Sequence, residues 1–153
     1  MKIFIGGSKT VSEIDDSVKE KLSEMIKNGC EILIGDCRGI DAAVQQFFAD
    51  NMYDGVTVYA TDGIVRNNVG GFKVKTVPSN GDVGFEFYRK KDSAMANDAD
   101  SGFMIWDRKS KGTGKNIFEL AELGKNVFVY FTDDNSFQNF QGIIGESLLM
   151  NLK

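Results

Sequence analysis

The chain has 153 residues, of which 42% are hydrophobic and 26% are charged, and its formal net charge is −4. This length and this composition are typical of one globular domain that buries a core of its own. The sequence contains no histidine, which excludes Ser-His-Asp catalysis, Cys-His catalysis and every histidine-bound metal. No apolar run reaches the roughly 18 residues of a membrane span, and the N-terminus lacks the longer apolar stretch of a signal peptide.

The two cysteines, Cys30 and Cys37, are too few for a disulfide framework, and their spacing without histidine makes a poor metal site. We therefore expect a cytoplasmic protein with no cofactor and no bound metal. The acidic charge balance disfavours broad contact with the phosphates of a nucleic acid. We expect neither a membrane nor a nucleic acid as the partner.

Short apolar runs alternate with helical patterns along the chain, which is typical of βαβ units and a parallel sheet. In chain order we expect a strand over 2–5, a helix from about 12 to 27, a strand over 31–34, a helix around 40–48, strands over 56–59 and 72–77, a helix over 82–98, a strand over 101–106, a helix over 116–123 and a strand over 126–131. The pattern predicts an α/β fold in one domain over 1–153. We expect a Rossmann-like three-layer sandwich with a mostly parallel sheet and helices on both faces.

Two features bear on how the elements begin and end. Ser12 is the expected N-cap of the first helix, because acidic residues follow it within one turn. Large apolar residues in the tail recur at helical spacing and predict a C-terminal amphipathic helix at about 134–152. These residues are Phe137, Phe140, Ile144, Leu148 and Leu152. The helix covers either the sheet or a partner subunit.

Glycine-rich, polar loops follow four of the predicted strands. In open α/β sheets, ligands bind outside the carboxyl ends of the strands, near a switch in strand order. Glycine lets the backbone approach a phosphate closely, and the N-terminus of a helix offers free N–H groups. The predicted ligand-binding residues are Gly6, Gly7, Ser8, Gly35, Asp36, Arg38, Gly39, Asp41, Arg66, Trp106, Lys109, Ser110, Gly112, Thr113 and Gly114.

Basic residues flank these loops although the chain as a whole is acidic. They are Lys9, Arg38, Lys109, Lys111 and Lys115. A cluster of cations on an acidic background suggests an anionic small molecule as the ligand. The alternative is that each lysine is a solvated loop charge.

Three residues at these loops have two interpretations each. Asp36 or Asp41 could hold ribose hydroxyls; alternatively, Asp41 caps its own helix and Asp36 pairs with Arg38. Trp106 ends a strand at a loop, where it either stacks on a base or forms an exposed edge of the core. The sequence leaves these alternatives open.

Several motifs occur in an order that is known from a protein family. They are Gly6-Gly7-Ser8, the run from Gly35 to Ala42, Lys91-Asp92 with Met95 and Asp100, and Trp106-Asp107 with Lys109 to Thr113. Together they resemble the SLOG superfamily, which unites the Rossmann domain of DprA, the LOG phosphoribohydrolases and small stand-alone proteins of bacteria and phages. The chain is most similar to the stand-alone YspA/YpsA-like group, over about residues 2 to 131. The resemblance implies a Rossmann-like fold, a homodimer or higher homo-oligomer, and a nucleotide-like ligand at these loops.

The same resemblance does not assign an activity. The catalytic glutamate of the LOG loop falls on Asn116, and the Arg-Lys pair of that group falls on Lys91-Asp92. Glu119 lies one helical turn beyond Asn116, a rise of about 5 Å.

Three functions remain open on the residues alone. The first is a sensor, carrier or sequestering protein that binds a nucleotide or a nucleotide-derived small molecule. The second is an N-glycoside hydrolase or transferase acting on a nucleotide, with Asp107, Glu119 or Asp36 as the carboxylate. The third is a DNA-associated accessory protein of the DprA kind.

Overall fold

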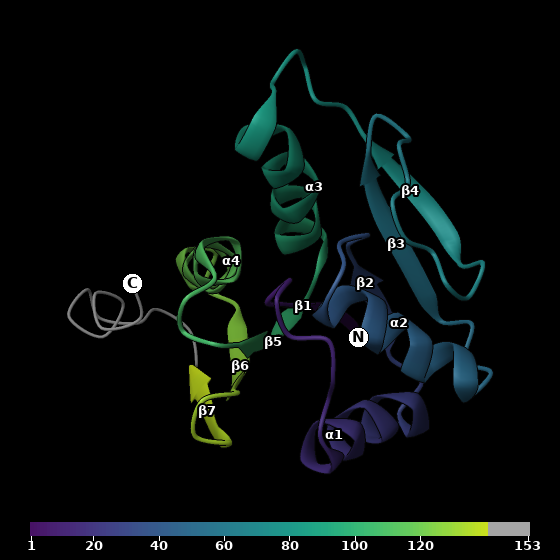
Figure 1. The fold of residues 1–153 in the computed structure, drawn as a ribbon, viewed down its shortest axis with the longest axis vertical. Helices are drawn as coiled ribbons and strands as arrows, with labels where there is room; N and C mark the ends of the chain where they lie inside the picture. Colours follow the sequence, from purple (N-terminus) through teal and green to yellow (C-terminus); the bar gives the residue numbers. More distant parts are fainter. Residues whose placement is uncertain (141–153) are drawn as a thin grey trace.

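The computed structural model describes residues 1–140, and within them seven strands form one sheet (Figure 1). The strand order is β4-β3-β2-β1-β5-β6-β7, with every neighbouring pair parallel except β6 and β7. In chain order the elements are β1 (Lys2–Gly7), α1 (Asp16–Lys27), β2 (Glu31–Ile34), α2 (Ile40–Asp50), β3 (Val56–Thr61), β4 (Lys73–Val77), α3 (Gly84–Asp98), β5 (Ser101–Trp106), α4 (Lys111–Glu122), β6 (Asn126–Phe131) and β7 (Ser136–Phe140). The predicted α/β fold, a Rossmann-like sandwich with a mostly parallel sheet, is confirmed.

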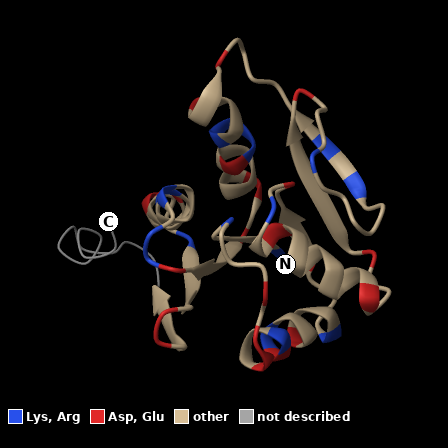
Figure 2. Ribbon diagram, viewed as in Figure 1, with Lys and Arg blue, Asp and Glu red and all other residues tan. Residues whose placement is uncertain are grey.

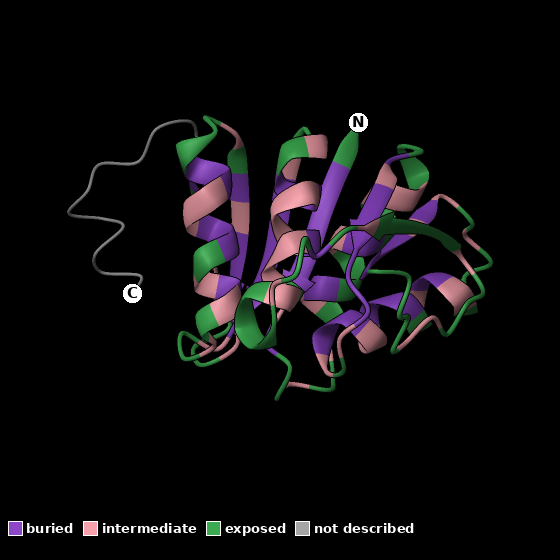
Figure 3. Ribbon diagram, turned by 90° about the horizontal axis from the view of Figure 1, so that it is seen from above, coloured by how far each residue is buried: buried purple, intermediate pink, exposed green. Residues whose placement is uncertain are grey.

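The helices cover both faces of the sheet. Side chains along a strand point alternately to opposite faces, so Ile5 of β1 packs with α1 and α2 whereas Phe4 packs with α3 and α4. Figure 3 shows the buried residues gathered along the strands and on the helix faces turned toward them. The hydrophobic core that contains Ile5 and the one that contains Phe4 therefore lie on opposite faces of the sheet, and the central strand β1 contributes to both.

The strand order reverses at β1, and this reversal positions the site. From β1 the chain builds outward through β2, β3 and β4, and then returns to the other side of β1 with β5. Because both neighbours run parallel to β1, the carboxyl ends of all three strands meet at one edge. This is the switch point where open α/β sheets bind their ligands.

Three helices begin at residues other than those predicted. Asp15 rather than Ser12 is the N-cap of α1, since its carboxylate accepts a hydrogen bond from the N–H of Val18 at 3.1 Å. Helix α3 begins at Gly84, and α4 begins at Lys111, five residues before the predicted start. Among residues 1–140, no helix is both long enough and apolar enough to cross a membrane.

The beginning of the predicted C-terminal helix is a strand. Residues Ser136–Phe140 form β7, which pairs antiparallel with β6 after a turn that contains Asn135 at φ 57°. Phe137 and Phe140 would share one side of a helix, but three residues apart on a strand they face opposite sides of the sheet. Phe137 stacks on Phe128 with ring centres 5.0 Å apart, whereas Phe140 is buried in the core beneath α3 and α4. The rest of the predicted helix, including Ile144, Leu148 and Leu152, lies outside the described residues.

Candidate functional site

The loops after β1, β2 and β5 contact one another at the switch point. The hydroxyl oxygen of Ser8 accepts a hydrogen bond from the N–H of Asp107 at 3.1 Å, and its carbonyl accepts one from the N–H of Ile40 at 3.3 Å. A methyl group on Gly7 would lie only 2.4 Å from Ile40 and 2.7 Å from the carbonyl oxygen of Ile105. Gly7 therefore allows α2 and β5 to approach the end of β1 closely, so that protein atoms, and not a phosphate, fill the space beside it.

Three other predicted glycines also lie at close approaches. Gly6 is buried in β1, where a methyl group would lie 3.2 Å from the sulfur of Met104. Gly39 has φ 77°, and a methyl group there would meet the backbone of Lys9 at 2.4 Å. Gly35 lies against two charged side chains, those of Asp41 and Lys91, at 2.8 and 3.2 Å from the position of the missing methyl. The first two predicted loops are therefore held against each other by backbone contact.

Asp36 joins the fourth predicted loop to the end of β2. It is 1% exposed and accepts hydrogen bonds from the backbone N–H of Arg66 at 3.0 Å and from its guanidinium at 2.7 Å. Burial alone raises the pKa of Asp36, but the hydrogen bonds and positive charge of Arg66 outweigh it, so the pKa lies below its usual value. The predicted pairing of Asp36 with Arg38 is wrong: Arg38 is exposed and has no ion pair among the described residues.

The loop that contains Arg66 has a second anchor in Gln45 of α2. The Gln45 amide is fully buried, donates to the carbonyls of Gly35 and Asn67 at 2.9 and 3.2 Å, and accepts from the N–H of Val69 at 3.0 Å. The Asn67 amide in turn donates to the carbonyl of Asp36 at 3.0 Å. The irregular segment between β3 and β4 is thereby fixed at the edge where the predicted site lies.

Asp41 lies beneath the loop that follows β2 and does not serve as the N-cap of α2. The N-cap is Gly39, and the Asp41 carboxylate accepts a hydrogen bond from the N–H of Cys37 at 3.2 Å. Burial raises the pKa of Asp41 to about 7, although the positive charge of Lys91 acts in the opposite direction. Lys91 is itself only 4% exposed and forms an ion pair with Asp92 at 2.9 Å. The Asp41 carboxyl and the Lys91 ammonium, both buried, thus lie directly against Gly35.

Asp107 shapes the start of α4. Its carboxylate accepts hydrogen bonds from the N–H groups of Lys109 and Ser110 at 2.9 and 2.8 Å, and from the hydroxyl of Thr10 at 3.3 Å. Burial alone raises the pKa of Asp107, but these hydrogen bonds outweigh it and the pKa lies below its usual value. Asp107 is therefore an ionised carboxylate that holds the loop in place.

The N-terminus of α4 keeps unused hydrogen-bond donors. The N–H groups of Lys111, Gly112 and Thr113 have no acceptor among residues 1–140, because the first turn of a helix precedes its own carbonyl ladder. A methyl group on Gly112 would contact nothing within 4 Å, whereas the Thr113 side chain is buried, with its hydroxyl 3.4 Å from that of Ser110. The partial positive charge of this helix end favours an anion.

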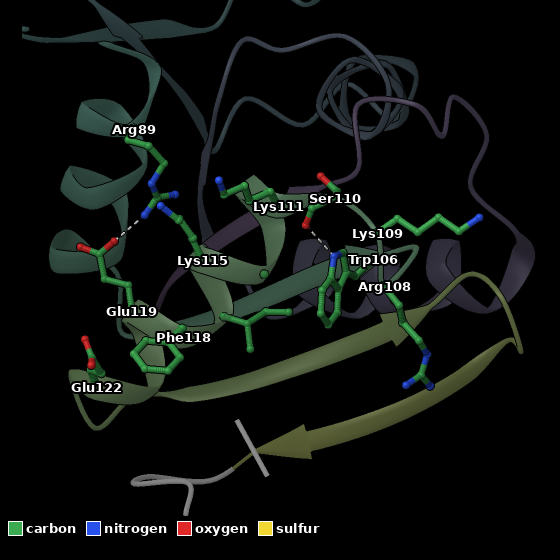
Figure 4. A pocket seen from close by; sticks show the side chains of 12 residues that line it. Arg89, Trp106, Arg108, Lys109, Ser110, Lys111, Lys115, Phe118, Glu119 and Glu122 are labelled. Atoms are coloured by element: carbon green, nitrogen blue, oxygen red, sulfur yellow. Dashed lines mark hydrogen bonds and ion pairs between the residues drawn. The ribbon is translucent and has the colours of Figure 1, made fainter. Parts of the chain in front are cut away.

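A cavity of about 770 Å³ adjoins this helix end (Figure 4). Its lining includes apolar groups from Trp106, Ile117 and Phe118, and it carries more cations than carboxylates. The cations are Arg89, Arg108, Lys109, Lys111 and Lys115, and the carboxylates are Glu119 and Glu122. Of the five cations, three have no ion pair with any described residue: Lys109, Lys111 and Lys115. A volume of this size suits a small-molecule ligand.

Trp106 lines the cavity but is a core residue. It is 2% exposed, its ring N–H donates to the carbonyl of Ser110 at 2.9 Å, and Gly114 leaves room for the ring at 3.1 Å. The ring therefore fixes the loop between β5 and α4 and offers almost no face to a base. Its burial corrects both predictions, the stacking surface and the exposed edge of the core.

Each of the three candidate catalytic carboxylates has its own internal hydrogen-bond partners. Asp36 is bound to Arg66, Asp107 to the loop before α4, and Glu119 to Arg89 at 2.7 Å and the hydroxyl of Ser93 at 3.1 Å. They share no hydrogen-bond partner among residues 1–140. Arg89 also contacts Asn116 and pairs with Asp92 at 3.2 Å, so Glu119 belongs to a network that joins α3 to α4.

The candidate-site prediction left out the polar residues at the buried side of α3 and α4. Lys91 stands four residues before the core residue Met95, and Asn116 four residues before Leu120, so each lies on the apolar stripe of its helix. A charged or amide side chain on such a stripe must find partners in the interior. A polar residue on an otherwise apolar helix stripe is therefore the sequence signal that could have identified Lys91 and Asn116.

Two comparisons with known proteins complete this description. No protein-family model matches the sequence, and no curated protein matches it. The structure itself shows an α/β sandwich of the Rossmann type with its switch point between β1 and β5.

Proposed function

We propose that the protein binds a nucleotide or nucleotide-derived anion at the carboxyl edge of its sheet, as a sensor, carrier or sequestering protein. The observation that supports this most is the N-terminus of α4, which lies at the switch point with free N–H groups beside Lys111 and Lys115. The helix dipole, the unpaired cations and the open space beside Gly112 all favour a phosphate there. The chain's net charge of −4 makes this local excess of cations stand out (Figure 2).

The motif order supports a related proposal, that the chain belongs to the YspA/YpsA-like group of the SLOG superfamily. The loops that carry the resemblance all follow parallel strands at one edge. A cytoplasmic homodimer or higher homo-oligomer belongs to the same proposal, and the mass of the protein in solution tests the oligomer.

The arrangement of carboxylates gives less support to an N-glycoside hydrolase or transferase. Such chemistry needs a carboxylate beside the glycosidic carbon and usually a second group that protonates the leaving base. Asp36, Asp107 and Glu119 are each occupied by internal partners. A DNA-associated role of the DprA kind draws less support, because the net charge of −4 disfavours broad contact with the phosphates of DNA.

Thermal melts of the protein with a panel of ligands test the proposal. The panel holds adenine, guanine, cytosine and uracil nucleotides, ADP-ribose, cyclic nucleotides and ribose 5-phosphate. A ligand present at about 100 times its Kd adds about 2.7 kcal/mol to the stability of the folded state, so we expect the midpoint to rise by several degrees. Chromatography of the same samples separates a binder, which releases no free base, from a hydrolase.

Substitutions of lysine test whether the ligand binds at the start of α4. Replacing Lys111 and Lys115 together by Met should weaken nucleotide binding about tenfold or more, because charge-assisted contacts to the phosphate are lost. Two matched replacements, Lys19→Met and Lys27→Met on α1, should leave binding unchanged although the net charge alters equally. Absence of any shift across the panel would contradict the proposal.

A further inference from the structure

A nucleotide at this edge needs a surface for its base, and the structure offers few rings for it. Trp106 is 2% exposed. Tyr88 is 42% exposed, but it packs edge-to-face with Phe87 at 5.0 Å between ring centres, and the guanidinium that lies 4.2 Å from its ring centre, that of Arg66, is held there by Asp36. Phe85, one helical turn earlier on α3, is 43% exposed.

Phe85 faces the cations that the proposed phosphate site uses. The ammonium groups of Lys111 and Lys115 lie 5.6 and 4.8 Å from the centre of its ring. Lys111 is also the first residue of α4, so its backbone N–H belongs to the anion-binding end of that helix. The side chain of Lys111 thus spans the distance between the ring of Phe85 and the free N–H groups at the start of α4. This distance is comparable to the length of one mononucleotide.

Phe85 belongs to neither core cluster of the described residues. It is the second residue of α3 and is 43% exposed, and Val83, two residues before it, is 81% exposed. Cations beside an aromatic face are attracted to the ring quadrupole. Basic side chains beside an aromatic ring are also the combination with which proteins bind the phosphate of a nucleotide and stack its base.

We propose that Phe85 is the stacking surface for the base, so that the site selects nucleotides with a planar base over sugar phosphates. This inference rests on the proposed function, because it places the base of the ligand whose phosphate occupies the start of α4. Phe85 is then a specificity-determining residue, whereas Lys111 and Lys115 bind the part that nucleotides and sugar phosphates share.

Calorimetric titrations of the full chain test this division. The ligands are AMP, GMP, CMP and UMP, with ribose 5-phosphate as the ligand that lacks a base. Phe85→Leu should weaken mononucleotide binding about tenfold or more, since stacking on an aromatic ring contributes that much, and should leave ribose 5-phosphate binding unchanged. Phe85→Trp should retain mononucleotide binding, and Val83→Ala serves as a control for the exposed start of α3.

The outcomes separate this inference from the proposed function. If the unmodified protein binds neither the mononucleotides nor ribose 5-phosphate, both fail. If Phe85→Leu binds mononucleotides as tightly as the unmodified protein, only the stacking role is overturned. The same conclusion follows if Phe85→Leu weakens both ligands equally or alters the oligomeric mass instead, since the ring then serves the fold or a subunit contact.

Discussion

The guanidinium of Arg66 donates a 2.7 Å hydrogen bond to the buried carboxylate of Asp36, across 30 residues of sequence. The backbone N–H of Arg66 donates to the other oxygen of the same carboxylate at 3.0 Å. Because Asp36 follows β2 and Arg66 follows β3, this pair holds two of the four predicted loops at one edge of the sheet. Arg66 thus contributes to the shape of the site, whether or not it also touches the ligand.

Asp36→Asn should lower the free energy of unfolding by about 2 kcal/mol, since hydrogen bonds to a charged group contribute about 1.5–3 kcal/mol. Urea unfolding measures the change. Lys75→Met is the matched control, because it removes an ion pair to Asp98 in which the lysine side chain is 54% exposed; it should cost less than about 1 kcal/mol. Equal losses in the two variants would show that the Asp36 pair contributes no more than a surface pair.

The titration of Asp41 should contribute to the pH dependence of the free energy of unfolding. Its pKa is about 7 in the folded protein because of burial, against 3.8 for an unperturbed aspartate. The folded state therefore binds a proton more tightly than the unfolded state between these values, so this group lowers the stability as pH rises from about 4 to 7. Asp41→Asn keeps an acceptor for the N–H of Cys37 and removes the titration.

Thermal midpoints of the two proteins between pH 5 and 8 measure this effect. The midpoint of Asp41→Asn should change less with pH than that of the unmodified protein, and the gain in stability should be largest at pH 8. Identical pH profiles would contradict a raised pKa at Asp41.

Gly7→Ala should destabilise the fold by about 1–3 kcal/mol, because the added methyl overpacks a core contact. Its two close neighbours are Ile40 at 2.4 Å and the carbonyl oxygen of Ile105 at 2.7 Å, and a backbone atom cannot rotate away. Gly112→Ala is the control, since its methyl meets nothing within 4 Å and alanine favours a helix by about 0.5–1 kcal/mol. Chemical unfolding of the two variants should give changes of opposite sign, and a loss of equal size in both would show that the contact at Gly7 relaxes freely.

The packing of strand β7 can be tested with a buried and an exposed position of the same strand. Phe140 is 3% exposed and lies in the core beneath α3 and α4, so Phe140→Ala should cost about 3–5 kcal/mol. Gln138 is an exposed residue of the same strand, and Gln138→Ala should change the stability by less than about 0.5 kcal/mol. A small effect at Phe140 would contradict its place in the sheet.

The sequence predicted the central strands well because both of their faces are buried. The runs at 31–34, 101–106 and 126–131 are continuously apolar after their first one or two residues, and the structure places strands over these same ranges. The prediction of a helix was wrong for Ser136–Phe140, and it was made because Phe137, Phe140 and Ile144 have helical spacing. The competing signal was Asp133-Asp134-Asn135, a turn sequence between two aromatic runs, which is typical of a β-hairpin.

The loops of the candidate site were predicted from glycines and strand ends, but their pairings were not. Asp36 with Arg66 and Arg89 with Glu119 are contacts between residues 30 apart, and no local pattern specifies them. The glycines at 112 and 114 argued for a loop, yet α4 already begins at Lys111 because Asp107 holds the preceding N–H groups. Burial of Trp106 likewise depends on the packing of Gly114, which only the folded chain reveals.

The most direct test of the central claim is a titration of the backbone amide NMR spectrum with the mononucleotide that raises the melting midpoint most. A phosphate at the start of α4 should move the amide signals of Lys111, Gly112 and Thr113 furthest, followed by that of Ser8 across the switch point. Saturable shifts at those residues are the result we predict. Shifts confined to α1, or none at a ligand concentration that saturates the thermal effect, would contradict a nucleotide site at this edge of the sheet.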